Sequence, residues 1–182
     1  IAAYSEPALE VAGDSYDFVE IDDNRLMLVV ADATGKGVPA CMLSAMTRSF
    51  VRSLAEGFEG MEEFLTQLNG CIFRDTDKAH FLTMAVLVLD RRTHVCEYAS
   101  AGHTPLLVRF PDGTTRSIAP DGPALGLLPN ELGVSFDTLN FAFQPGTSVM
   151  IFSDGFSESL NLGGEEFGLE RLEELWRERE RS

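Results

Sequence analysis

One stretch of the chain, Leu26 to Met46, constrains the fold more than any other. It opens with the continuous apolar run Leu26–Ala31, which is β-branched at its centre and is therefore typical of a strand buried on both faces. Asp32 follows directly, so the pattern places a carboxylate at the rim of a sheet. A loop with two glycines comes next and permits a tight turn, and Pro39 suits the first turn of a helix. An acid at a strand end beside a glycine loop is suited to binding a hard cation.

This pattern alone supports two interpretations of Asp32. Asp32 and Thr34 can simply cap the helix that follows, as short polar side chains often do. Alternatively, Asp32 is a metal ligand. Two other acids favour that interpretation, because Asp14 precedes a strand-like segment and Asp154 follows the apolar run Val149–Phe152. Three acids at strand ends can converge on one site, and a set of oxygen ligands selects Mg²⁺ or Mn²⁺ over zinc.

The composition excludes several other classes of function. The chain has 182 residues, of which 45% are hydrophobic, enough for a sizeable core. Fourteen basic and 29 acidic residues give a net charge of −15, which disfavours binding to nucleic acid or to an anionic membrane. The cysteines Cys41, Cys71 and Cys96 form no C-x-x-C motif, which argues for a reducing compartment. Because no apolar run approaches the ~20 residues of a membrane span, we expect a cytoplasmic protein.

Hydrophobic periodicity predicts strands, then two helices, then many antiparallel strands and a last helix. We expect extended segments or strands at Ile1–Tyr4, Ala8–Ala12, Tyr16–Ile21, Arg25–Ala31, Phe81–Asp90, Val95–Ala99, Leu106–Phe110, Thr114–Ile118, Val134–Leu139, Asn140–Phe143 and Ser148–Ser153. We expect helices at Val38–Leu54, Met61–Phe73 and Glu165–Arg181 and a loop at Ala119–Leu132. This order of elements indicates a layered α+β domain.

Four motifs occur together in the chain, and their combination is specific where each alone is weak. They are Gly13-Asp14-Ser15-Tyr16-Asp17-Phe18, Asp32-Ala33-Thr34-Gly35-Lys36-Gly37, Ala101-Gly102-His103-Thr104-Pro105 and Ser153-Asp154-Gly155-Phe156-Ser157-Glu158. The set resembles the SpoIIE-type branch of the metal-dependent serine/threonine phosphatases, the protein phosphatase 2C-like (PPM) superfamily. The resemblance covers essentially the whole chain. It implies a four-layer α-β-β-α sandwich of two antiparallel sheets flanked by helices, with a binuclear Mn²⁺ or Mg²⁺ site at one edge.

The resemblance also implies roles for individual residues. Asp32 would bridge both metal ions, Asp14 would hold one and Asp154 the other, and the backbone carbonyl of Ala33 would complete a shell. Two bridged cations can bring the pKa of bound water close to neutrality, so hydroxide would attack phosphorus in line without a phosphoenzyme. His103 follows Ala-Gly at a strand end and could orient a ligand or donate a proton to the leaving group. A loop histidine is, however, more often a hydrogen-bonded structural residue.

The sequence departs from the family pattern in one important respect. The family usually carries a further Asp-Asp pair on a late strand, and this sequence stops at Ser182 before such a motif. We therefore expect residues 1–182 to be a single phosphatase domain, excised from a longer signalling protein and lacking its last strand. The alternative is a depleted site in a pseudophosphatase that binds its partner without turnover.

The function implied by the resemblance is removal of phosphate from serine or threonine on a regulatory phosphoprotein, in this branch a STAS-type anti-anti-sigma factor. A sensor or receiver domain is expected in the full-length protein, and a homodimer is possible.

Three further residues have no assigned role in the motifs. Asp17 either supports the metal ligands from outside their shell or is a solvated residue at the start of a strand. His80 and His94 lack acid partners at a recognisable spacing and are expected at the surface. Because arginines are scarce near the motifs, metal ions are expected to offset the charge of the phosphate.

Overall fold

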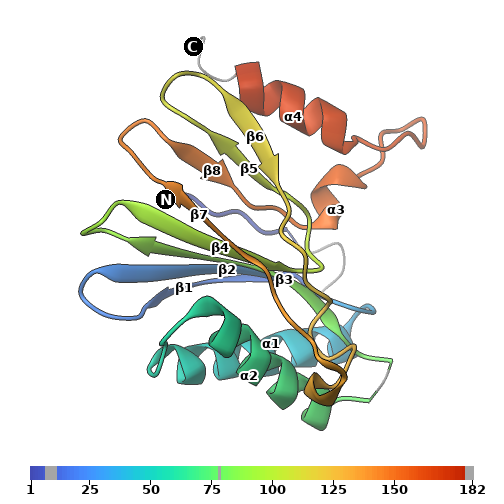
Figure 1. The fold of residues 1–182 in the computed structure, drawn as a ribbon. Coiled ribbons are helices and arrows are strands. Elements are labelled where there is room, and N and C mark those ends of the chain that lie inside the picture. The colour runs from blue at the N-terminus through green and yellow to red at the C-terminus, as the bar shows by residue number, and fades with distance from the viewer. Residues whose placement is uncertain (7–11, 78, 179–182) are drawn as a thin grey trace.

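The computed structural model describes residues 1–6, 12–77 and 79–178. The elements in chain order are β1 (Ser15–Glu20), β2 (Arg25–Ala33), α1 (Val38–Ala55), α2 (Met61–Asp75), β3 (Leu82–Asp90), β4 (Val95–Ala101), β5 (Leu106–Arg109), β6 (Thr115–Ile118), the 3₁₀ helix η1 (Asn130–Leu132), β7 (Thr138–Ala142), β8 (Ser148–Met150), α3 (Asp154–Ser157) and α4 (Leu169–Glu178). They form four layers, with α1 and α2 below one sheet and α4 above a second sheet (Figure 1). The expected α-β-β-α sandwich is confirmed.

The larger sheet has the strand order β1-β2-β3-β4-β7, and all its pairs are antiparallel. Its central strand β3 is apolar on both sides because both faces are covered. Met84, Val86 and Val88 belong to the core against α1 and α2. Ala85 and Leu87 belong to the core between the two sheets. The period-two alternation of a strand thus explains why this part of the sequence reads as a continuous apolar run.

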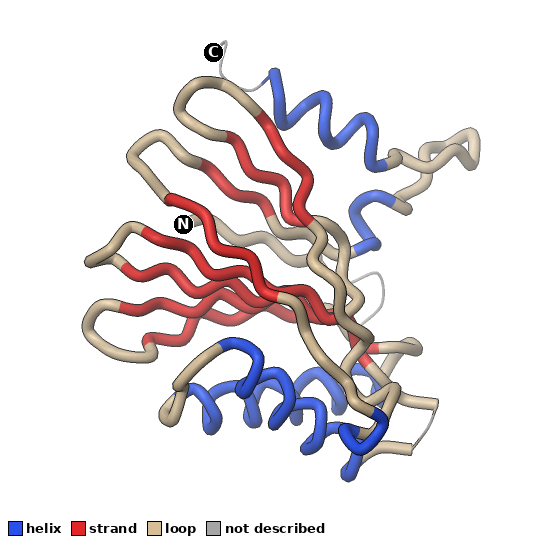
Figure 2. The backbone as a smooth tube through the Cα atoms, viewed as in Figure 1, coloured by secondary structure: helices blue, strands red, loops and turns tan. Residues whose placement is uncertain are grey.

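The smaller sheet has the order β6-β5-β8 and packs face to face with the larger one. Leu106 and Val108 of β5 point into the core between the sheets. Leu107 points to the opposite face, where it joins Leu172 of α4 in a separate apolar cluster. Figure 2 shows the red strands between the blue helices, with hairpin turns at one end of the strands and longer loops at the other.

The long loop after β6 is tied to α2 by one buried side chain, Asn69. Its amide nitrogen donates to the carbonyl of Leu128 at 3.0 Å and to Oδ1 of Asn130 at 2.6 Å. Its Oδ1 accepts from the backbone N–H of Gly126 at 2.8 Å. Asn69 is fully buried, so these bonds replace water that the amide cannot reach. The segment 119–132 is therefore a loop, as expected, except that its last three residues form the 3₁₀ helix η1, and the segment has a fixed place on the helical layer.

The strand expected at Val134–Leu139 is wrong in its first four residues, because β7 runs from Thr138 to Ala142. The residues before it are held by other contacts. Phe136 is buried in the core on the helix side of the larger sheet, and the N–H of Asp137 donates to the carbonyl of Asp121. The apolar side chains in this segment anchor a loop, which the sequence pattern alone does not separate from a strand.

The last helix begins later than expected, at Leu169 instead of Glu165. The preceding residues form a turn in which the N–H of Phe167 donates to the carbonyl of Ser159, and Leu160 pairs with Glu166. The expected extension of the helix to residue 181 lies outside the described residues. At the other end of the chain, residues 1–6 form no strand, and the prediction for residues 8–12 falls largely outside the described residues.

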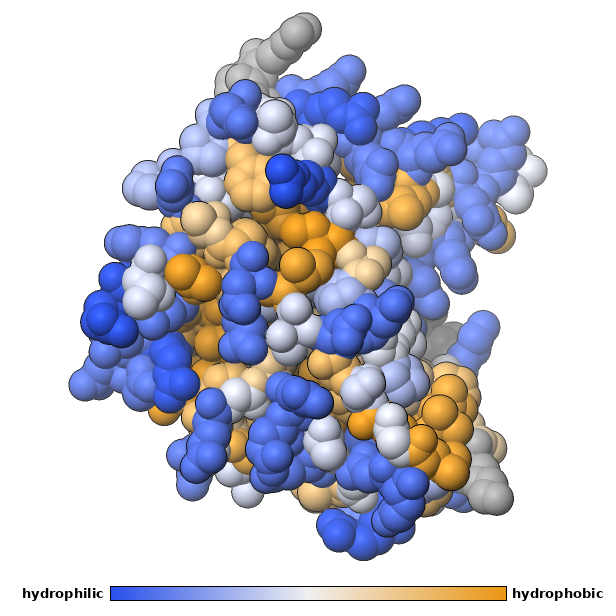
Figure 3. Space-filling view, in the orientation of Figure 1, coloured by the Kyte–Doolittle hydropathy of each residue, from blue (hydrophilic) through white to orange (hydrophobic). Residues whose placement is uncertain are grey.

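Polar side chains cover most of the helices and loops on the face shown in Figure 3, and apolar side chains reach the surface between the layers. Within the described parts of the chain, no helix combines the length and the apolar composition needed to cross a bilayer.

Candidate metal centre

Three elements bring acids to one end of the sandwich. Asp14 directly precedes β1, Asp32 is the penultimate residue of β2, and Asp154 opens α3 shortly after β8. β1 and β2 are antiparallel neighbours, and Ser15 pairs with Ala31, so the start of β1 lies beside the end of β2. Because β8 belongs to the smaller sheet, the acids come from both sheets. The convergence expected from the sequence is therefore present.

The glycine loop turns away from Asp32 without a side-chain cap. Gly35 and Gly37 have φ angles of +94° and +71°, which residues other than glycine rarely adopt. Gly37 is the N-cap residue of α1 and has no side chain that could cap the helix. The hydroxyl of Thr34 donates to the carbonyl of Phe81 at 2.8 Å and accepts from the N–H of Phe81 at 3.1 Å. The capping interpretation is therefore wrong, and the carboxylate of Asp32 is free for another role.

A close approach of two backbones places the carbonyl of Ala33 beside Asp14. A Cβ atom on Gly13 would lie 2.8 Å from the Ala33 carbonyl oxygen and 3.2 Å from Cβ of Ala40. Only glycine allows the start of β1 to come this close to the end of β2 and the first turn of α1. The Ala33 carbonyl, which is expected to bind metal, is thus held next to Gly13, the residue before Asp14.

The acids act on one another strongly. Burial is the largest cause that raises the pKa of Asp32, to about 8, and the nearby carboxylates of Asp14 and Asp154 raise it further by hydrogen bonding and by charge. Ser153 donates a hydrogen bond to Oδ2 of Asp14 at 2.6 Å. Asp14 and Asp32 are half-buried, whereas Asp154 is exposed. Several carboxylates that crowd one another at a partly buried site are the surroundings in which a cation binds best.

The oxygen ligands at this end of the sandwich suit hard divalent cations, but the acids do not form a compact site for a single ion. Across residues 1–6, 12–77 and 79–178, no three histidine, cysteine or acidic side chains gather tightly enough to hold a single ion. Asp14, Asp32, Asp154 and the Ala33 carbonyl would hold divalent cations only if the acids were divided between two ions and water supplied further oxygens. Carboxylates, a backbone carbonyl and water are the ligands that Mg²⁺ and Mn²⁺ prefer.

His103 lies in the corner after β4 and is buried, with 8% of its surface exposed. Its Nδ1 is 2.8 Å from the hydroxyl of Thr83, and its backbone N–H donates to Oγ of Ser100 at 3.0 Å. Burial lowers the pKa of His103 to about 4, although the carboxylates of Asp14 and Asp154 oppose this shift. His103 therefore lies close enough to Asp14 and Asp154 for their charges to act on its ring. Its role, as an orienting residue or as a proton donor, stays a prediction.

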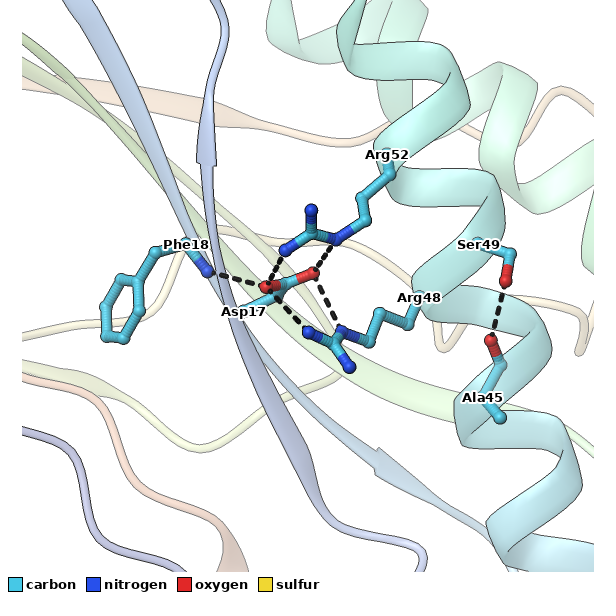
Figure 4. A network of polar contacts seen from close by, with 6 residues as sticks. All are labelled: Asp17, Phe18, Ala45, Arg48, Ser49 and Arg52. Atoms are coloured by element: carbon cyan, nitrogen blue, oxygen red, sulfur yellow. Dashed lines mark hydrogen bonds and ion pairs between the residues drawn. The ribbon is translucent and has the colours of Figure 1, made fainter.

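Asp17 is neither solvated nor a member of the acid cluster; it is the centre of an ion-pair network (Figure 4). Its carboxylate accepts from Arg52 at 2.7 Å through both Nε and Nη2, and from Nε of Arg48 at 3.0 Å. Burial alone would raise the pKa of Asp17, but the two arginines and the N–H of Phe18 outweigh it and lower the pKa below 3.8. The network joins β1, at whose start Asp14 lies, to α1.

Two expectations from the sequence need correction here. Arginines are not scarce near the motifs, because Arg48 and Arg52 reach Asp17 from successive turns of α1. Their spacing of four residues is the signal that could have revealed a shared partner. His80 does have an acid partner, since its Nδ1 lies 2.6 Å from Asp77. It is nevertheless partly exposed, and His94 is exposed, as expected.

Comparison with known proteins agrees with this geometry. Residues 22–182 match the family model described as Stage II sporulation protein E (SpoIIE). This chain belongs to the SpoIIE family. The match includes Asp32, His103 and Asp154 and begins after Asp14. The chain is 31% identical over 159 residues to the phosphoserine phosphatase RsbU of Bacillus subtilis, covering 87% of this chain and 46% of RsbU. It is 23% identical over 159 residues to the phosphoserine phosphatase RsbP of the same organism, covering 85% and 39%.

Solved structures show the same fold for this SpoIIE-family domain. The SiaA-PP2C domain of Pseudomonas aeruginosa superposes with a TM-score of 0.81 at 20% identity, covering 95% of this chain and 68% of that one. The RsbU and RsbW domains of a Mycobacterium tuberculosis protein give a TM-score of 0.73 at 26% identity, covering 85% and 42%. The structure of RsbX in complex with magnesium gives 0.68 at 23% identity, covering 82% and 69%. The chain spans less than half the length of the curated relatives it matches.

Proposed function

We propose that this chain is a Mn²⁺- or Mg²⁺-dependent phosphatase that hydrolyses phosphoserine or phosphothreonine on a regulatory protein. The observation that carries the proposal is the convergence of Asp14, Asp32 and Asp154 at one end of the sandwich, where burial first and the two neighbouring carboxylates second raise the pKa of Asp32. Membership of the SpoIIE family supports it, because two relatives are phosphoserine phosphatases. The structure of RsbX with magnesium supports the choice of metal.

In this proposal Asp14, Asp32, Asp154 and the backbone carbonyl of Ala33 are the groups that would hold the two divalent cations. Bound there, two divalent cations would activate water for in-line attack on phosphorus and offset the charge of the phosphoryl oxygens. The chain itself supplies fixed positions for these oxygens. Asp32 is held within a strand, and the approach at Gly13 holds the Ala33 carbonyl. Rigid support of this kind is what an electrostatic catalyst requires.

The substrate and the setting belong to the same proposal. Resemblance within the family favours a phosphorylated STAS-type anti-anti-sigma factor as the substrate, and a sensor or receiver domain elsewhere in the full-length protein. A neighbour in the structural comparison comes from a bacterial stressosome, which is a signalling assembly. The net charge of −15 supports a protein partner over nucleic acid. A cytoplasmic location is part of this proposal.

The test is hydrolysis of p-nitrophenyl phosphate and of a phosphoserine protein with and without Mn²⁺, beside calorimetric titration of Mn²⁺. We expect turnover that depends on Mn²⁺ and that Asp32→Asn abolishes. The matched control is Asp23→Asn, the same substitution at an exposed hairpin position, which should behave as the unchanged protein. Turnover that persists in Asp32→Asn would contradict the proposal.

A pseudophosphatase that binds its partner without turnover is the second candidate. It is favoured by one observation, namely that no three acid, cysteine or histidine side chains within the described residues can hold a single ion. Absence of both turnover and measurable Mn²⁺ binding in the unchanged chain would favour this candidate. Mn²⁺-dependent turnover that Asp32→Asn removes would contradict it.

A further inference from the structure

His103 is hydrogen-bonded through only one of its two ring nitrogens. Nδ1 is 2.8 Å from Oγ1 of Thr83, whereas Nε2 is buried and makes no hydrogen bond of normal geometry within the described residues, although the carbonyl of Phe152 is close enough to act on the ring. Leaving a buried polar atom without a partner costs about 1–3 kcal/mol, so such atoms call for an explanation. The acid cluster lies on this same side of the molecule, because Asp14 and Asp154 both act on the ring by charge.

The surroundings decide which nitrogen carries the proton. Besides Thr83, the polar groups that act on the ring are the carboxylates of Asp14 and Asp154 and the carbonyl of Phe152. All three can only accept a hydrogen bond once the acids are ionised. The hydroxyl of Thr83 can either donate or accept. The favoured arrangement therefore has Thr83 donating to Nδ1, with the proton of the neutral imidazole on Nε2.

The position of Thr83 connects His103 to the shared acid. Thr83 of β3 stands directly opposite Asp32 of β2 in the antiparallel register. Opposed residues of neighbouring strands lie on the same face of a sheet, so the hydroxyl that orients His103 comes from the position beside Asp32.

Thr104, the residue after His103, is hydrogen-bonded to the segment that leads to Asp154. The hydroxyl of Thr104 donates to the carbonyl of Phe152, two residues before Asp154. Ser153, between them, donates to Asp14 at 2.6 Å. The corner that contains His103 is thus bonded to the segment that carries Asp154, and that segment is bonded to Asp14.

We propose that His103 is a positioning residue of the metal centre, in which Thr83 orients a neutral imidazole and Nε2–H donates to the carboxylate of Asp14 or Asp154 when metal binds. This inference rests on the proposed function, because it assumes a metal at the cluster. A neutral donor suits the role better than an imidazolium, because a positive charge would repel the cations. Carboxylates that bind metal are commonly held by such outer hydrogen bonds, whose loss typically costs 10–100-fold in affinity.

The first test is calorimetric titration of Mn²⁺ into variants at His103. His103→Leu removes the donor, and we expect affinity for Mn²⁺ to fall about 10–100-fold. His103→Gln places an amide N–H near the position of Nε2–H and should restore most of that loss. His94→Leu, at an exposed histidine, is the control and should bind Mn²⁺ as the unchanged protein does. Circular dichroism of each metal-free variant checks that it folds.

The second test measures the tautomer by the ¹⁵N chemical shifts of the imidazole ring, which needs no metal. We expect His103 to be neutral with the proton on Nε2. Thr83→Val removes the hydroxyl without changing the volume greatly, and should populate the other tautomer and weaken Mn²⁺ binding. Thr138→Val, at an exposed strand position, is the control. Because Thr83 acts through His103, the double variant Thr83→Val with His103→Leu should bind Mn²⁺ no more weakly than His103→Leu alone.

The outcomes separate this inference from the proposed function. If the unchanged chain binds no Mn²⁺, the proposed function fails and the positioning role fails with it. If the chain binds Mn²⁺ and His103→Leu binds it equally well, the positioning role alone is overturned. Unchanged affinity with a lost kcat would indicate a proton donor instead, and a ring protonated on Nδ1 would overturn the orientation by Thr83.

Discussion

Asp32 shows how one side chain can serve the site at the expense of the fold. It is partly buried beside two other acids, and these surroundings disfavour its charged form. In the metal-free chain this repulsion opposes folding, and a bound cation would relieve it. Residues that destabilise the fold locally are expected at functional sites, where selection for activity outweighs the cost in stability.

Replacing Asp32 by Asn should therefore raise the stability of the metal-free protein while removing its activity. The substitution keeps the shape and removes one of the crowded charges. We expect the midpoint of thermal unfolding to rise by about 2–4 °C, the shift that 1 kcal/mol produces in a domain of this size. Differential scanning calorimetry in the presence of a chelator measures it. A lower midpoint would mean that Asp32 stabilises the fold through contacts that Asn cannot replace.

Asp17 presents the opposite case, an acid that stabilises the folded chain. Its side chain is 9% exposed, and the paired Arg48 and Arg52 are 54% and 52% exposed. Asp17→Asn should lower the free energy of unfolding by about 1–3 kcal/mol at pH 7, below the range for fully buried pairs because both guanidinium groups are half in water. Urea denaturation measures the difference.

The pH dependence of that difference follows from the pKa of Asp17, which is lower in the folded chain than its ordinary value of 3.8. The stabilisation is complete above 3.8 and is lost as the pH falls through the folded-state pKa. The unchanged protein and Asp17→Asn should therefore converge in stability as the pH falls below 3.8. A difference that stays constant down to acid pH would show that the charge of Asp17 is not its source.

At the scale of elements, sequence patterns located most strands and helices because their periodicity is set by burial. The continuous apolar run in β3 reports that both faces of this strand are covered. In α1 the apolar spacing located the helix but not its covered face, because Met42 is exposed while Leu43 and Val51 are buried. The patterns failed where apolar residues anchor irregular backbone. Phe136 before β7 and Phe167 before α4 are such anchors. The backbone bonds in these segments, from Asp137 to Asp121 and from Phe167 to Ser159, join loop residues in a way that periodicity does not reveal.

The approach of β1 to β2 and α1 depends on Gly13. Gly13→Ala would place Cβ 2.8 Å from the carbonyl oxygen of Ala33, so the strands must separate. We expect a loss of about 1–3 kcal/mol in stability, as for other overpacked positions, together with weaker Mn²⁺ binding because the carbonyl moves. Gly57→Ala is the control, since its Cβ would meet open space. Equal metal affinity in Gly13→Ala and the unchanged protein would refute a role for this approach.

The attachment of the loop 119–132 to α2 depends on Asn69. Asn69→Leu keeps the volume but leaves the carbonyl of Leu128 and the N–H of Gly126 without their buried partner. The free energy of unfolding should fall by at least about 2 kcal/mol. Gln67→Leu, at an exposed position two residues earlier, should change it by less than about 0.5 kcal/mol. If the two variants are equally stable, the bonds of Asn69 contribute nothing net.

At the scale of the whole molecule, the site was easier to predict than its supports. Asp14, Asp32 and Asp154 follow motifs that are local in sequence, so their convergence could be expected. Their supports are long-range: Thr83 orients His103, and Arg48 and Arg52 pair with Asp17, each across separate elements. Such contacts depend on the register of strands and the rotation of helices, which short patterns do not specify.

Because the chain is strongly negative, specific Mn²⁺ binding must be distinguished from the general screening of charge repulsion by salt. With 29 acidic and 14 basic residues, any salt should relieve some repulsion. Mn²⁺ at 100 times its dissociation constant should add about 2.7 kcal/mol to stability, well beyond NaCl at equal ionic strength. Thermal unfolding in the two salts measures the difference, which Asp32→Asn should abolish. Equal effects of the two salts would indicate screening alone.

The origin of the acids in two different sheets has a mechanical consequence. Ions held jointly by Asp14 and Asp32 from the larger sheet and by Asp154 beyond β8 of the smaller one would act as a removable cross-link between the halves of the sandwich. Because the ions would bind the folded chain and not the unfolded one, they would stabilise the fold and fasten one end of the interface between the sheets. Chelation should then speed hydrogen exchange first at the end of the sandwich that carries the three acids, so that local stability and activity would be lost together.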